Sequence, residues 1–105
     1  GQVQVQVSVS EDDGDTWSEP RVLDDSGRVL GHIGPVWSAD GRLSWARLDG
    51  QVELCSLSAA LTSSSEPICT PLEAQIIDSL SVDGSGWWVS LRTEEGRLEM
   101  RWIGP

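Results

Sequence analysis

Apolar and polar residues alternate along most of this chain. In residues 3–9 every second residue is valine, and Gln or Ser stands between the valines. A period of two is that of a β-strand with one face buried. Similar short stretches, most of them bounded by Gly, Asp or Ser, predict strands at 36–38, 42–48, 51–57, 76–81, 87–92 and 97–103. No stretch carries a helical period over a convincing length, so the sequence predicts an all-β fold.

Turn residues separate these predicted strands. Asp49-Gly50 stands between two of them and predicts a two-residue hairpin of type I′, in which both central residues need positive φ. Asp40-Gly41 and Asp83-Gly84 predict further tight turns of the same kind. Short strands at this spacing indicate an antiparallel meander, which hides its edges by closing up or by stacking sheets.

The spacing also contains a repeat. The tripeptide Ser-Glu-Pro occurs at 18–20 and 65–67, and a Ser-x-Asp-Gly turn occurs at 38–41 and 81–84. Two units of about 46 residues, with four short strands each, match the length of a β-propeller blade. We therefore expect 1–105 to be one propeller segment with approximate repeats 1–57 and 58–105. Trp45 and Trp88 share one repeat position, which predicts that both lie in the core.

One motif is specific. Residues 10–17 read Ser-Glu-Asp-Asp-Gly-Asp-Thr-Trp and fit the pattern Ser-x-Asp-x-Gly-x-Thr-Trp at Ser10, Asp12, Gly14, Thr16 and Trp17. This segment resembles the Asp-box of sialidases and related β-propeller proteins. The expected roles are structural: Asp12 accepts hydrogen bonds from turn amides, Gly14 supplies a positive φ, and Trp17 folds its indole over the hairpin.

The resemblance implies an architecture. In that family the box joins the third and fourth strands of a blade. The chain would therefore contain the last two strands of one blade, a whole blade and the first three strands of another. Residues 58–65, where a second box would lie, lack Asp, Gly and Trp, which indicates a degenerate repeat. A closed propeller has about four to eight blades. The expected partners are therefore further blades, from a homo-oligomer or from a parent chain, and the start at Gly1 indicates a processed or excised piece.

Composition narrows the possible functions. Seventeen acidic residues against seven Arg give a net charge of -10, which argues against nucleic acid and anionic membranes as partners. The family uses a Tyr nucleophile, whereas this chain contains no Tyr and its arginines are scattered, so no catalytic residue is assigned. His32 and two cysteines are too few for a zinc site, and the acids of the box lack the spacing of a calcium loop. We expect neither a metal nor a cofactor.

The two cysteines allow two interpretations. If a hairpin centres near Thr62, Cys55 and Cys69 lie opposite each other, and a disulfide there would close a loop of about 15 residues, worth roughly 3 kcal/mol. Such a bond would indicate an oxidising compartment, extracellular or periplasmic. The alternative is a pair of small buried thiols.

The tryptophans carry the remaining hypotheses. Trp87 and Trp102 stand where the other repeat has serine, and we expect them opposite or diagonal to each other across the turn at 94–96. Together with Trp37 they are candidates to stack on a sugar ring, or to seal a neighbouring blade. The sequence thus favours a non-catalytic binding or scaffold module, with glycan binding as its more specific form. The alternatives are a piece of a larger sialidase-like glycoside hydrolase with its catalytic residues elsewhere, and an assembly fragment without a ligand.

Overall fold

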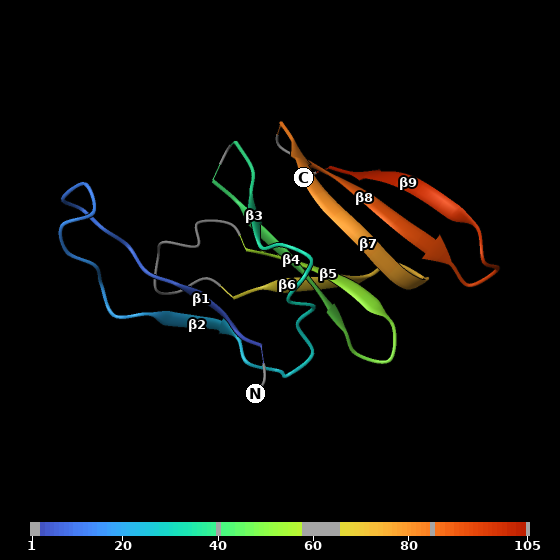
Figure 1. Cartoon of the computed structure of the whole chain (residues 1–105), viewed down its shortest axis with the longest axis horizontal. Helices are drawn as coiled ribbons and strands as arrows, with labels where there is room; N and C mark the ends of the chain where they lie inside the picture. Colours follow the sequence, from blue (N-terminus) through green and yellow to red (C-terminus); the bar gives the residue numbers. More distant parts are fainter. Residues whose placement is uncertain (1–2, 40, 58–65, 85, 105) are drawn as a thin grey trace.

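The computed structural model describes residues 3–39, 41–57, 66–84 and 86–104, and every regular element in these ranges is a β-strand (Figure 1). The all-β prediction is therefore confirmed. The strands are β1 (Val5–Val7), β2 (Arg21–Asp24), β3 (Val36–Trp37), β4 (Leu43–Leu48), β5 (Val52–Leu57), β6 (Ile68–Pro71), β7 (Ala74–Asp83), β8 (Gly86–Thr93) and β9 (Leu98–Ile103).

The strands form three antiparallel sheets in chain order. Sheet 1 holds β1 and β2, sheet 2 holds β3 to β6, and sheet 3 holds β7 to β9, each as a simple meander. Two, four and three strands are the groups expected when residues 10–17 join the third and fourth strands of a blade. The second repeat of that box, at 58–65, lies outside the described residues.

Sheet 2 is the middle layer. In Figure 1 it lies between the β1–β2 hairpin and the β7–β9 sheet. Alternation along β4 and β5 gives sheet 2 two apolar faces. Buried residues on one face, with Trp45 at the centre, join Val5 and Leu23 of sheet 1 in one core cluster. On the other face Leu54 joins a second cluster with Val89 of sheet 3. Among the described residues, each outer sheet is thus covered on the side that faces sheet 2.

The β4–β5 hairpin differs from the expected type I′ turn. Leu48 pairs with Val52, so three residues form the loop, and the Asp49 N–H donates to the Gln51 carbonyl over 3.0 Å. Of these three residues, Gly50 alone has a positive φ, 75°. The extra residue explains the difference, because a three-residue loop needs one left-handed position rather than two. In the predicted Asp40-Gly41 turn, Asp40 lies outside the described residues.

The expected equivalence of Trp45 and Trp88 is wrong. Trp45 is fully buried, whereas 38% of Trp88 is exposed. In β8 it is Trp87, Val89 and Leu91 that are buried, and Trp88 lies on the opposite side of the strand. A shift of one residue in alignment exchanges the two faces of a strand, and this shift places Trp88 outward.

Candidate functional site

The turn that joins β1 to β2 contains the Ser-x-Asp-x-Gly-x-Thr-Trp segment, and Asp12 organises it. Its Oδ1 accepts hydrogen bonds from the Thr16 backbone N–H (2.8 Å) and the Ser10 hydroxyl (2.9 Å), and its Oδ2 accepts one from the Thr16 hydroxyl. These bonds from Thr16, followed by that from Ser10, lower the pKa of Asp12 below its ordinary value. The carboxylate is thus engaged entirely within its own turn.

The other box residues complete the turn. The Ser10 hydroxyl oxygen accepts the Gly14 N–H over 2.7 Å, and Gly14 has a φ of 94°, which a side chain would resist. Where the turn meets the strands, the Ser18 N–H donates to the Val9 carbonyl over 2.8 Å. Trp17 is 64% exposed and lines a hollow together with Val9 and Ser18. Its expected place over the hairpin stays a prediction.

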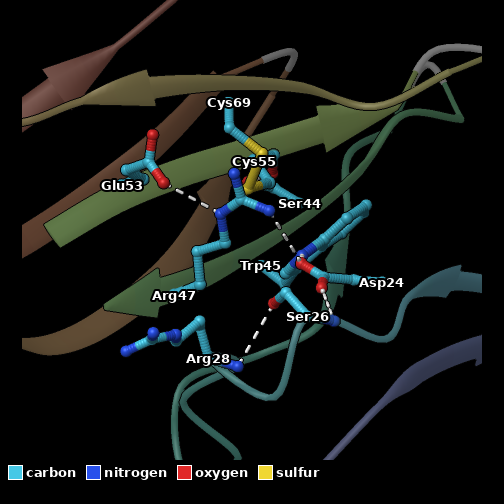
Figure 2. Close-up of a disulfide and its surroundings, with 9 residues drawn as sticks. All are labelled: Asp24, Ser26, Arg28, Ser44, Trp45, Arg47, Glu53, Cys55 and Cys69. Carbon is cyan, nitrogen blue, oxygen red and sulfur yellow. Dashed lines mark hydrogen bonds and ion pairs between the residues drawn. A yellow bond between two sulfur atoms is a disulfide. The ribbon is translucent and has the colours of Figure 1, made fainter. Parts of the chain in front are cut away.

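A charged cluster lies between sheets 1 and 2, where Asp24 ends β2 and Arg47 and Glu53 pair across β4 and β5 (Figure 2). The Trp45 indole N–H donates to Asp24 Oδ2 over 2.8 Å, and the Ser26 N–H donates to Oδ1 over 3.0 Å. Arg47 Nη1 lies 3.7 Å from Asp24 Oδ2, and its Nε donates to Glu53 Oε1 over 2.9 Å. Arg47 therefore links two carboxylates.

Electrostatics favour the charged forms of Asp24 and Arg47. Burial acts to raise the pKa of Asp24, but hydrogen bonds from Ser26 and Trp45 and the charge of Arg47 outweigh it, so the pKa lies below its ordinary value. The hydrogen bond to Glu53 is the main cause that raises the pKa of Arg47. A cleft of about 460 Å³ opens beside these groups. Asp24 is an anion at neutral pH and accepts hydrogen bonds from the Ser26 and Trp45 N–H groups.

The disulfide lies beside the same cleft. Cys55 of β5 pairs directly with Cys69 of β6, their Cα atoms are 4.0 Å apart, and the sulfurs are bonded. Figure 2 shows the bond alongside the Arg47 guanidinium. Cys55 is completely buried, and the Ser44 hydroxyl donates to its carbonyl over 2.9 Å. Of the two alternatives for the cysteines, the structure contains the disulfide, while the expected turn centre near Thr62 lies outside the described residues.

The three candidate tryptophans do not form one surface. Trp37 on β3 and Trp102 on β9 are 45% and 46% exposed, whereas Trp87 is buried. The register pairs Trp87 with Ile103 and Trp88 with Trp102. The expected pairing of Trp87 with Trp102 is therefore wrong, because adjacent register positions point to opposite faces. Trp88 is the indole that shares a face with Trp102. Counting residue pairs outward from the 94–96 turn would have identified Trp88 from the sequence.

Trp87 instead lines a cavity of about 340 Å³ between sheets 2 and 3. The Arg42 guanidinium carbon lies 4.4 Å from the centroid of its ring, in cation–π geometry. Within the part of the chain that the structure describes, the buried Trp87 Nε1 has no hydrogen-bond partner. Leu54, Leu72 and Arg101 also line this cavity. Trp87 can meet a ligand only inside this space and not on the outer surface.

Comparison with known proteins yields no relative: no family model, no curated protein and no solved structure matches the chain. Among the residues that the structure describes, no group of three or more His, Cys, Asp or Glu side chains is placed to hold a metal ion. The same residues contain no helix with the length and apolar character needed to cross a bilayer.

Proposed function

We propose that this chain is a non-catalytic Asp-box β-propeller segment that serves as a binding or scaffold module. One observation carries the proposal: the sheets contain two, four and three strands, and the Asp-box turn joins the two strands of sheet 1. That arrangement is the one expected for the end of a blade, a whole blade and the beginning of a third. The Asp12 hydrogen bonds to Thr16 give the motif a structural role in the turn.

Further blades complete the module in this proposal. Sheet 2 shows what a covered blade needs, because apolar side chains from both of its faces lie in core clusters. Sheets 1 and 3 have such cover on one side only. Repeat sheets of this kind gain stability from neighbours on both sides. The missing neighbours come from other copies of the chain or from a parent chain.

Glycan binding is the sharper form of the proposal. Exposed indoles such as Trp37 and Trp102 offer flat apolar faces on which a sugar ring can stack. A neutral glycan suits them better than an anionic one, because the chain carries a net charge of -10. The Cys55–Cys69 disulfide supports an extracellular or periplasmic setting, where such bonds persist and glycans are met.

The proposal assigns no catalysis to this chain. It has no Tyr for the nucleophile that sialidases use. If the chain is a piece of a larger sialidase-like glycoside hydrolase, the catalytic residues lie elsewhere in that protein.

A glycan array tests the proposal. The chain should bind a subset of neutral glycans, and Trp37→Ala or Trp102→Ala should reduce that binding at least tenfold if the indole is a contact. Trp17→Ala is the matched control, because Trp17 is also exposed but lies in the Asp-box turn. Absence of binding by a folded chain would remove the glycan form and leave the scaffold form. Release of sialic acid from a sialoside would contradict the whole proposal.

A further inference from the structure

The outward side of sheet 3 is strongly apolar. Five large side chains lie on it, which we call the open face: Ile76, Trp88, Leu98, Met100 and Trp102. Register pairs Trp88 with Trp102, pairs Met100 with Ser90, and places Ile76 and Leu98 on either side of Arg92. Leu98 is 73% exposed and Met100 is 64% exposed. Contiguous apolar surface of this kind marks an interaction site in a soluble protein.

The two indoles of the open face are fixed in place. The Trp88 N–H donates to Asp83 Oδ2 over 2.9 Å. The Trp102 ring lies against two glycines: a Cβ at Gly86 would stand 2.6 Å from Trp102 Cζ2, and one at Gly104 would stand 2.7 Å from Cζ3. Side chains that are already ordered lose little rotamer entropy when a partner covers them. A partner can therefore cover these two indoles with little loss of side-chain entropy.

The far side of sheet 1 does not complement the open face. Its exposed residues include Gln4, Gln6 and Val22, and the Gln6 amide donates to the Gln4 side-chain oxygen over 2.9 Å. Stacking copies head to tail would bury these amides against indoles and Met100, and amides buried without partners are costly. A ring of head-to-tail copies is therefore a poor match for these two surfaces.

The open face does complement itself. Arg92 lies toward one end of β8, whereas Asp83 lies at the other end, where it pairs with Gly86. A two-fold axis in the plane of the interface, crossing the strands at the level of Val89, midway between Arg92 and the Gly86 level of Asp83, places Arg92 of each copy opposite Asp83 of the other. Apolar side chains then meet apolar side chains between these charges, as in an isologous interface.

We propose that the open face of sheet 3 is a two-fold dimerisation surface and that its occupant is the same face of a second copy of this chain. The proposal rests on the proposed function only in that sheet 3 needs a covering layer, and it names that layer. In the dimer Trp102 is covered, so Trp37 is the candidate indole left open to a glycan. Two Arg92–Asp83 ion pairs set the orientation, and the five apolar residues supply the buried area.

Charge reversal tests the pairing by analytical ultracentrifugation. The chain should sediment as a dimer of twice its 11.4 kDa mass. Arg92→Asp and Asp83→Arg should each raise the dimer dissociation constant about tenfold or more, because each places like charges together at both ends. An equimolar mixture of the two variants should dimerise again, since each mixed dimer contains two opposite-charge pairs. Arg28→Asp, an equal change in charge beside the β4–β5 turn of sheet 2, is the control and should leave the constant unchanged.

Three outcomes would overturn the dimer. They are a monomer at all concentrations, a larger ring insensitive to Arg92→Asp, and a mixture that stays as weakly associated as its components. Met100→Asp should give a folded monomer, with near-UV circular dichroism as the check on folding. A monomeric chain whose glycan binding is lost in Trp102→Ala would assign the open face to a sugar instead. That result would end the dimer proposal but would leave the proposed function standing.

Discussion

Asp24→Asn is the substitution whose cost follows most directly from the structure. Asp24 uses both carboxylate oxygens, Oδ1 for the Ser26 N–H and Oδ2 for the indole N–H of the fully buried Trp45. Asparagine keeps the shape but has one acceptor oxygen, so one donor loses its partner. A lost hydrogen bond to a charged group costs about 1.5–3 kcal/mol. The attraction to Arg47 adds less than about 1 kcal/mol, because Arg47 is partly exposed.

We therefore expect Asp24→Asn to lower the free energy of unfolding by about 2–3 kcal/mol, and the Tm by roughly 10–20 °C in a domain of this size. The assay is urea unfolding at neutral pH, followed by tryptophan fluorescence and circular dichroism at one fixed protein concentration, because association shifts apparent stability. Asp25→Asn is the matched control, since Asp25 is the exposed neighbour, and it should stay within about 0.5 kcal/mol of the wild type. Equal stability of the two variants would refute the assigned role of Asp24.

Three further predictions concern pH, the Asp-box and the disulfide. Because the folded pKa of Asp24 lies below its unfolded value, its stabilisation is present above about pH 4 and is lost as pH falls through the folded value. Acid titration should therefore narrow the difference in unfolding free energy between wild type and Asp24→Asn. A constant difference would contradict this prediction. Gly14→Ala should lower the free energy of unfolding by about 1 kcal/mol or more, as measured by urea unfolding. The cause is the φ of 94° and not a clash, since no atom lies within 4 Å of the added Cβ. An alanine variant as stable as the wild type would argue against the turn geometry. Reduction of Cys55–Cys69 should lower the free energy of unfolding by roughly 3 kcal/mol, and an unchanged urea midpoint with dithiothreitol would show that the bond adds nothing.

Much of the fold could be predicted from the sequence because strand alternation is local. The valines of residues 3–9 and the period of β4 and β5 indicated the strands, and the structure divides them into sheets of two, four and three strands. The Asp49-Gly50 turn type could not be predicted with the same success. Its conformation depends on whether the pairing of Leu48 with Val52 leaves two or three residues in the loop.

The candidate site was less predictable because it depends on which face each strand turns to a neighbour. Repeat alignment placed Trp88 in the core, and one residue of shift exchanged it with Trp87. The Asp24–Arg47–Glu53 cluster left no local signal, because Asp24 reaches Trp45 and Arg47 only through the contact of sheets 1 and 2. A buried carboxylate at a strand end is visible only after the sheets are stacked.

A crystal structure of the assembled protein tests the central claim most directly. The account predicts sheet 2 between sheets 1 and 3, neighbouring sheets fanned about a common axis as blades are, and Asp12 bonded to Thr16 within the β1–β2 turn. Two layers that face each other in an isolated sandwich, or β1 and β2 joined edge to edge with β9 of the same chain in one continuous sheet, would contradict it.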